Sequence, residues 1–93
     1  MRKIYMVCYD ICDDKRRNRI IRELLKFGIR TQYSVFECKL TEKEKNYLKR
    51  EISKIINEKE DLVYFYPLSE NSYKKIIRTG SNIDYLPIHD IFI

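Results

Sequence analysis

The stretch IYMVCYD at residues 4–10, with ICDDKRR at residues 11–17 behind it, decides the fold of this chain. Six apolar or aromatic residues stand in a row between Lys3 and Asp10, too few for a buried helix and typical of a strand covered on both faces. A buried strand ends on a carboxylate only where that end opens onto water, a metal or a cation. Asp13 can then cap a helix with a basic first turn, so we expect chemistry on phosphate groups at this strand end.

The length and composition of the chain indicate a single small domain. Its 93 residues, 44% of them hydrophobic, predict one domain over residues 1–93, with a core over 1–80 and a C-terminal tail over 81–93. A domain of this size buries little apolar surface within itself, and a subunit interface adds more. The sequence therefore predicts a homodimer.

The positive charge is concentrated at the N-terminal end. The formal net charge is +5, and residues 1–30 hold nine Lys or Arg against four Asp or Glu, whereas residues 61–93 hold three against four. Such a concentration favours a surface that binds nucleic acid. A basic surface that only keeps the protein in solution is the alternative, and net charge alone does not separate the two.

The cysteines predict a reduced, cytoplasmic chain. Cys8, Cys12 and Cys38 have no CxxC spacing, so neither a disulfide framework nor a zinc site is expected. Cys8 and Cys38 fall in expected strands, where they would pack as small hydrophobic side chains. The sequence contains no secretory leader and no apolar run of membrane-spanning length, so we expect no membrane partner.

The first helix is predicted from about Asp14 to Phe27, with Gly28 as its left-handed cap. Its apolar side consists of Ile20, Ile21, Leu24, Leu25 and Phe27, and its opposite side is a basic stripe of Lys15, Arg19, Arg22 and Lys26. Arg17 falls among the apolar positions and needs an anionic partner there. That partner is either Asp13 or Asp14, or a phosphate at the Asp10 end of the strand.

The middle of the chain alternates strands and helices. Residues 30–40 form either one bent strand or a short strand followed by a longer one. Thr41 and Glu44 form a capping box that begins a second helix. The buried side of this helix consists of Leu48, Ile52, Ile55 and Ile56. A polar turn over 57–61 then leads to a strand over 62–66 that is closed by Pro67.

The C-terminal part is less regular in pattern. After a turn over 69–72, residues 73–79 form a strand or a short helix, and we prefer a strand that ends at Gly80. The apolar tail 81–93 would bury itself along a sheet edge, preferably that of a partner protomer. Together these elements predict an α+β fold, a ferredoxin-like sandwich with a mixed β-sheet and two helices on one face. A second copy is the expected cover of the bare face.

Asp10 is the candidate for chemistry. It either caps a turn or binds a metal, and Mg²⁺ commonly takes only one or two protein carboxylates. A single Asp10 supplies only one protein ligand to a metal. Two Asp10 side chains brought together across a dimer axis would supply two, which is enough for Mg²⁺. His89, the only histidine, is better explained as structural or exposed, so hydrolysis would rely on metal-activated water. Tyr5, Tyr9, Tyr64 and Tyr66 could stack on bases or serve core or dimer packing.

Three motifs, in this order and spacing, resemble those of a known family. They are Tyr9-Asp10-Ile11 followed by Asp13-Asp14 and an arginine-rich helix, QYSVFE at 32–37, and Tyr66-Pro67-Leu68. The chain resembles, from Ile4 to Gly80, the Cas-two family of CRISPR adaptation proteins, the partner of the CRISPR integrase. It departs from the family pattern at Cys12 and in the tail beyond Gly80.

The resemblance implies a ferredoxin-like homodimer in which the C-terminal strand completes the other protomer's sheet. It also implies Mg²⁺ held by Asp10 at the dimer axis, nuclease activity and a role in acquiring new spacers. Tyr9, Arg17, Arg19 and Phe36 fall at positions that the family associates with activity or nucleic-acid contact.

Two main hypotheses follow. In the first, the protein is a Mg²⁺-dependent endoribonuclease in which Asp10 is both metal ligand and catalytic residue. The residues expected to bind nucleic acid are Lys15, Arg16, Arg17, Arg19, Arg22 and Lys26, with support from Tyr9, Ser34 and Phe36. In the second, the same basic residues bind duplex DNA and the protein is a non-catalytic scaffold between integrase dimers. A toxin-like small ribonuclease is a third alternative.

Overall fold

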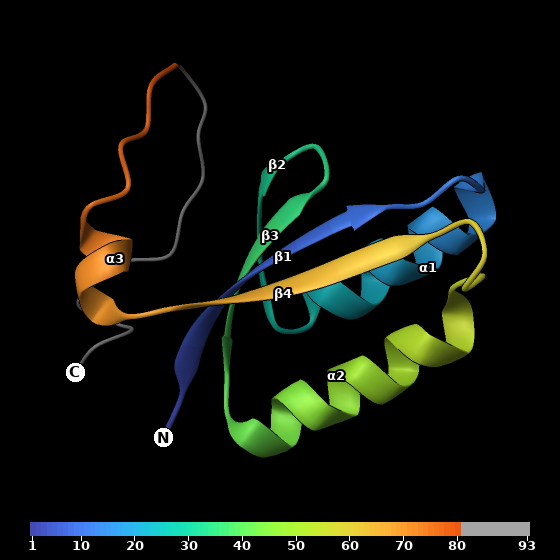
Figure 1. Cartoon of the computed structure of the whole chain (residues 1–93), viewed down its shortest axis with the longest axis horizontal. Helices are drawn as coiled ribbons and strands as arrows, with labels where there is room; N and C mark the ends of the chain where they lie inside the picture. The colour runs from blue at the N-terminus through green and yellow to red at the C-terminus, as the bar shows by residue number, and fades with distance from the viewer. Residues whose placement is uncertain (81–93) are drawn as a thin grey trace.

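A computed structural model describes residues 1–80, which form one four-stranded sheet and three helices (Figure 1). The elements are β1 Lys3–Asp10, α1 Asp14–Leu25, β2 Gly28–Gln32, β3 Val35–Leu40, α2 Glu42–Ile55, β4 Leu62–Leu68 and α3 Glu70–Lys74. The strands lie in the order β2-β3-β1-β4, and every pair is antiparallel. The predicted α+β sandwich is confirmed, with the βαββαβ order of ferredoxin-like folds. The sheet is antiparallel rather than mixed, because both neighbours of β1 run against it.

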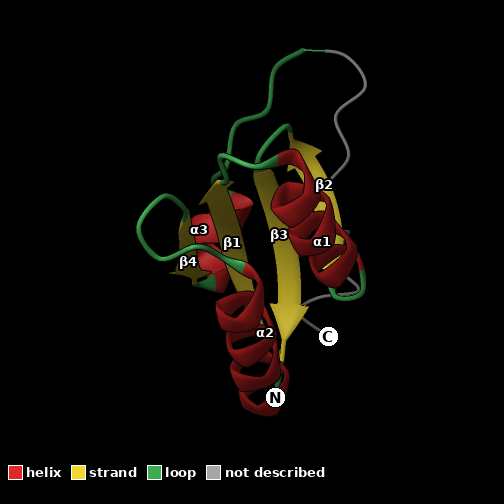
Figure 2. Cartoon of the chain, turned by 90° about the vertical axis from the view of Figure 1, so that its right-hand side faces the viewer, coloured by secondary structure: helices red, strands yellow, loops and turns green. Residues whose placement is uncertain are grey.

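Strand β1 lies at the centre of the core. Helices α1 and α2 cover one face of the sheet (Figure 2), and Tyr5, Val7 and Tyr9 of β1 are buried against them. The other elements add the buried residues Ile20, Leu24, Phe36, Cys38, Leu40, Leu48, Ile52 and Ile55. Each fully buried aliphatic or aromatic side chain stabilises the fold by about 1.5–3 kcal/mol. The alternation of β1 therefore determines which face of the sheet meets the helices.

Helices α1 and α2 begin at the N-caps that the sequence predicts. Asp13 caps α1, since its Oδ2 accepts the Arg16 N–H at 2.9 Å. The capping box of α2 is also confirmed. The Thr41 hydroxyl accepts the Glu44 N–H at 3.1 Å, and the Glu44 carboxylate accepts the Thr41 N–H at 2.8 Å. These hydrogen bonds satisfy backbone donors that the helices themselves leave unpaired.

The end of α1 differs from the prediction in two ways. The helix ends at Leu25, which is 57% exposed rather than part of the apolar side. Gly28 is not a left-handed cap but the first residue of β2, and Gly80 is the glycine with positive φ among residues 1–80. A Cβ at Gly28 would lie 2.6 Å from the Cys38 Sγ and 2.9 Å from the Cys38 Cα. The glycine is needed because β3 approaches closely at this point.

Two further points concern the later strands. Residues 30–40 divide between β2 and β3, with a turn at Tyr33 and Ser34 between them. β4 does not stop before Pro67 but continues to Leu68. It can do so because β4 is an edge strand, where a residue without an N–H leaves the ladder intact.

The predicted strand over 73–79 is wrong. Residues 70–74 form helix α3, and residues 75–79 have no regular structure. Ser69 begins α3, because its hydroxyl accepts the Ser72 N–H at 3.1 Å. Tyr73 of α3 is buried against Ile4, on the sheet face opposite α1 and α2. The predicted tail strand over 81–93 lies outside the described residues.

The close approach at Gly28 predicts a steric cost for any side chain there. Gly28→Ala should lower the free energy of unfolding by about 1–3 kcal/mol, the usual effect of overpacking a tight contact. Urea unfolding, followed by circular dichroism, measures the change. If Gly28→Ala were as stable as the wild-type protein, β2 and β3 would lie further apart than described.

Candidate functional site

Asp10 ends β1 on the face opposite the two large helices. It is exposed and pairs with Leu62 of β4 in the antiparallel ladder. Side chains alternate along a strand, and Tyr9 is buried on the helix face. The carboxylate of Asp10 therefore opens onto the other face of the sheet.

That second face is open along β4 and covered over β3. Along β4, Leu62, Tyr64 and Tyr66 keep 51%, 50% and 49% of their surface exposed. On β3, Glu37 is buried, and its carboxylate accepts hydrogen bonds at 2.8 Å from Tyr73 and Arg78. Asp10 thus lies at the margin of an apolar area that residues 1–80 leave uncovered.

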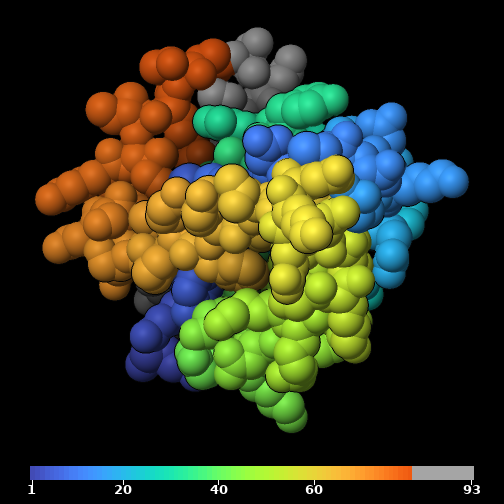
Figure 3. Space-filling model, turned by 45° about the vertical axis from the view of Figure 1, so that its right-hand side comes forward, coloured from blue at the N-terminus to red at the C-terminus, as the bar shows by residue number. Residues whose placement is uncertain are grey.

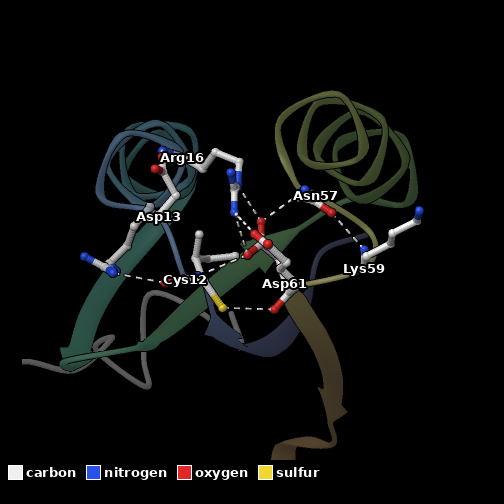
Figure 4. Close-up of polar contacts among 9 residues, drawn as sticks. Cys12, Asp13, Arg16, Asn57, Lys59 and Asp61 are labelled. Carbon is white, nitrogen blue, oxygen red and sulfur yellow. Dashed lines mark hydrogen bonds and ion pairs between the residues drawn. The ribbon is translucent and has the colours of Figure 1, made fainter.

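The loop after Asp10 is joined to the loop before β4 by a buried carboxylate. Asp61, 3% exposed, accepts hydrogen bonds from Arg16 Nε at 2.7 Å, from the Cys12 N–H at 3.0 Å and from the Asn57 N–H at 2.8 Å. Figure 4 shows Arg16 and Asn57 reaching Asp61 from the two sides. In the space-filling view, the blue segment after β1 and the yellow segment before β4 lie side by side (Figure 3).

The charge on Asp61 is stabilised by these donors. The Arg16 guanidinium is the main cause that holds the pKa of Asp61 well below its usual range, with the Asn57 and Cys12 N–H groups adding to it. The same hydrogen bond raises the pKa of Arg16. Arg16 also contacts Glu60 at 3.0 Å, so its guanidinium is already used within the chain.

Arg17 is likewise engaged within the loop. Its Nη1 contacts Asp14 Oδ1 at 2.6 Å, and its Nη2 donates to the Ile11 carbonyl at 3.0 Å. Of the partners that the sequence left open for Arg17, the structure therefore contains Asp14. Arg16 and Arg17, both predicted to bind nucleic acid, are each held by a carboxylate of this protein.

The basic stripe of α1 remains on the surface. Lys15, Arg19, Arg22 and Lys26 are exposed, although Lys26 also contacts Glu23 at 3.0 Å. Arg19 and Arg22 line a hollow of about 140 Å³ between α1 and α2, together with Lys54, Ile55 and the carboxylates of Glu23 and Glu51. Lys54 contacts Glu51 at 2.9 Å, so a phosphate backbone that crosses this hollow would meet Arg19 and Arg22 beside an ion pair.

The predicted supporting residues are mostly internal. Tyr9 and Phe36 are buried, with ring centroids 6.2 Å apart, and burial raises the pKa of the Tyr9 hydroxyl. That hydroxyl donates to the Tyr33 carbonyl at 3.0 Å, while the Tyr9 N–H donates to the Ser34 carbonyl at 3.1 Å. In this arrangement Tyr9, Ser34 and Phe36 hold the β2–β3 turn beside the Asp10 strand and do not present a surface for a base.

Asp10 is the residue of the candidate site that could hold a metal. Among residues 1–80, no group of three or more His, Cys, Asp or Glu side chains could bind a metal. Asp10 offers one exposed carboxylate, which is the kind of ligand that Mg²⁺ accepts together with water and phosphate oxygens. The donor therefore suits Mg²⁺.

Sequence reasoning missed Asp61 and Lys54. In the sequence, Asp61 was assigned only to a polar turn. It stands directly before an apolar strand, as Asp10 stands directly after one, and this position could have marked it as a functional candidate. Lys54 belongs to a helix with balanced charge, and only the packing of α2 beside α1 shows that it lies near Arg19 and Arg22. No helix within residues 1–80 has the length and apolar character needed to cross a membrane.

Sequence comparison finds matches along most of the chain. Residues 2–76 match the family described as CRISPR associated protein Cas2. A protein of Thermodesulfovibrio yellowstonii named CRISPR-associated endoribonuclease Cas2 2 is 45% identical over 83 residues, which cover 89% of this chain and 91% of the relative. A Thermus thermophilus protein named CRISPR-associated endoribonuclease Cas2 is 46% identical over 70 residues, 72% of this chain and 74% of the relative.

Solved structures agree with the fold. The crystal structure of Streptococcus pyogenes Cas2 at pH 6.5 superimposes with a TM-score of 0.76 and 32% identity, covering 83% of this chain and 99% of that chain. A chain of a structure described as a partial Cas6-RT-Cas1–Cas2 complex superimposes with a TM-score of 0.75 and 36% identity, covering 91% of this chain and 94% of that chain.

The low pKa of Asp61 predicts a loss of stability in acid. The unfolded chain binds this proton more tightly than the folded one, because an ordinary Asp has a pKa of about 3.9. The stabilisation is therefore complete above that pKa and is lost as the pH falls below it. Asp61→Asn should lower the melting temperature at pH 7 by on the order of 5–10 °C, and the difference from wild type should shrink toward pH 3.

Thermal unfolding of both proteins between pH 7 and pH 3 makes this comparison. Glu60→Gln is the control, since it removes an exposed contact of the same Arg16 and leaves Asp61 in place. A difference between Asp61→Asn and wild type that stayed constant across the whole pH range would show that folding does not lower the pKa of Asp61.

Proposed function

The chain belongs to the CRISPR-associated protein Cas2 family, and from this premise we propose that it is an endoribonuclease that works with the Cas1 integrase in CRISPR adaptation. The reaction is hydrolysis of phosphodiester bonds in single-stranded RNA, with Mg²⁺ held at Asp10. The observation that carries the proposal is the exposed Asp10 carboxylate at the margin of an uncovered apolar face. Membership of an adaptation family argues against a toxin-like ribonuclease.

A homodimer completes the site. The exposed Leu62, Tyr64 and Tyr66 lie on the same face as Asp10, and an uncovered area of this kind is typical of a protein–protein contact. A second copy packed on this face would cover the tyrosines and bring the two Asp10 carboxylates to one axis. The tail 81–93, which lies outside the described residues, would add a strand to the partner's sheet.

Within such a dimer the residues have separate tasks. The two Asp10 carboxylates would hold Mg²⁺, which when bound would supply a more acidic water and charge neutralisation at the phosphate. The loop after β1 in each protomer would keep its carboxylate in place. Lys15 at the start of α1 is the exposed cation of the stripe closest in sequence to Asp10 and binds the RNA backbone there.

A second function, as a scaffold on duplex DNA, is favoured by the position of the basic stripe. Arg19 and Arg22 of the stripe lie with Lys54 on the helix layer, whereas Asp10 opens on the opposite face of the sheet. A duplex bound across α1 and α2 would thus be separated from the Asp10 carboxylate by the thickness of the sheet. Duplex binding and RNA cleavage can therefore occur on different surfaces of one protein.

Substitution of Asp10 separates the two functions. Asp10→Asn should abolish Mg²⁺-dependent cleavage of single-stranded RNA, since it removes the charged metal ligand, while dimerisation and duplex affinity stay at wild-type values. Cleavage of a labelled RNA with and without Mg²⁺ is the measurement, and Asp14→Asn, with a side chain 88% exposed, is the matched control. Full cleavage by Asp10→Asn would exclude the nuclease site. Unchanged spacer acquisition would then fit the scaffold.

Salt dependence tests the basic stripe. For duplex DNA, the logarithm of the binding constant falls with the logarithm of the salt concentration by about 0.9 per phosphate contact. The double variant Arg19→Ala, Arg22→Ala should therefore reduce this slope by about two. The control is Lys43→Ala, Lys49→Ala, which removes the same charge from exposed positions of α2. An unchanged slope in the arginine double variant would exclude the stripe as the DNA surface.

A further inference from the structure

The peptide group between Ile11 and Cys12, which follows Asp10 by one residue, is held at both ends by charged side chains. Its carbonyl accepts a hydrogen bond from Arg17 Nη2 at 3.0 Å, and its N–H donates to Asp61 Oδ1 at 3.0 Å. A guanidinium thus holds the oxygen of this peptide and a carboxylate holds its hydrogen. We refer to Arg17, Asp61 and the Ile11–Cys12 peptide as the peptide clamp.

Both side chains of the peptide clamp are themselves fixed. Asp61 is buried and also accepts from Arg16 Nε at 2.7 Å and from the Asn57 N–H at 2.8 Å. Arg17 is held by Asp14 at 2.6 Å. Because charge-assisted hydrogen bonds are about twice as strong as neutral ones, these contacts restrain the peptide plane firmly.

The clamp limits the freedom of Asp10. On its N-terminal side, Asp10 is fixed by the ladder in which Tyr9 pairs with Val63 and Asp10 with Leu62. On its C-terminal side, Ile11 is 4% exposed and its carbonyl is held by Arg17. The exposed carboxylate is therefore carried by a backbone that is fixed before and after it.

We propose that Asp61 and Arg17 are positioning residues that set the placement of the Asp10 carboxylate through the Ile11–Cys12 peptide. This inference rests on the proposed role of Asp10 in the nuclease site. A displacement of a reacting group by about 1 Å can cost a factor of 100 in rate, so a fixed backbone at this point has a direct catalytic value. Arg17 then acts through the loop and not through a contact with phosphate.

The test uses one variant for each side of the clamp, with matched controls. Asp61→Asn weakens the hold on the Cys12 N–H, and Arg17→Met removes the hold on the Ile11 carbonyl while keeping an unbranched side chain. The control for the first is Glu60→Gln, which removes an outer ion pair of Arg16 and leaves Asp61 in place. The control for the second is Arg50→Met, which makes the same change at an exposed position of α2.

Two measurements are made well below the melting temperature of every variant. The first is steady-state cleavage of a fluorogenic single-stranded RNA with Mg²⁺, which separates kcat from KM. The second is the alkylation rate of the Cys12 thiol, read by peptide mass spectrometry. Cys12 is exposed, and its Sγ contacts the Glu60 carbonyl at 3.2 Å, so the rate reports on the loop independently of activity. Cys38 does not interfere, since burial raises its pKa to about 12.

The proposal expects kcat to fall by roughly 10- to 100-fold in both clamp variants, with KM unchanged and Cys12 alkylated several times faster. Both controls should behave as wild type. A raised KM with unchanged kcat in Arg17→Met would show that Arg17 contacts RNA and would overturn the proposal, as would unchanged alkylation in both clamp variants. If Asp61→Asn does not fold, the kcat, KM and Cys12 alkylation rate of Arg17→Met alone support or overturn the proposal.

The two proposals can fail separately. Absence of any cleavage by the wild-type protein would overturn the nuclease function and, with it, the positioning role. Normal cleavage by wild type together with wild-type kcat in both clamp variants would overturn the positioning role and leave the nuclease function intact.

Discussion

The alternation of side chains along β1 is the constraint on which the rest of the structure depends. Tyr5, Val7 and Tyr9 face α1 and α2 and are buried, so the intervening residues, ending with Asp10, face the other way. A shift of one residue in the pairing of β1 would move the aromatic side chains into water and Asp10 into the core. The burial of the aromatic residues therefore fixes the exposure of the carboxylate. β1 therefore contributes to both the stability of the core and the candidate site. A change in the register of this strand would disturb both.

Features of the fold that depend on neighbouring residues could be predicted from sequence, and features that depend on distant residues could not. Asp13 and the pair Thr41 and Glu44 were identified correctly as helix starts, since a cap acts on N–H groups two or three residues away. Gly28 was misassigned because the reason for a glycine there is Cys38 on a neighbouring strand. Residues 73–79 were misassigned because burial of Tyr73 against Ile4 is a contact between the two ends of the described chain.

The same limit applies to the candidate site. Helical periodicity placed Arg17 on the sheet side of α1 and left open which anion it meets. It could not show that Arg16 binds Asp61, which lies in another loop far along the chain. A count of basic residues thus overstates the surface available to nucleic acid. Two arginines at the start of α1 stabilise the loop, while Lys15, Arg19, Arg22 and Lys26 remain exposed.

The contact of Glu37 with Tyr73 and Arg78 has a consequence for quaternary geometry. Residues 69–80 thicken the sheet face over β3 and leave β4 bare, so two identical sheets could stack only with an offset across the strands. The extent of this offset would set the spacing of the two Asp10 carboxylates. Relatives with a longer or shorter segment after β4 would then differ in that spacing while keeping every residue near the carboxylate the same.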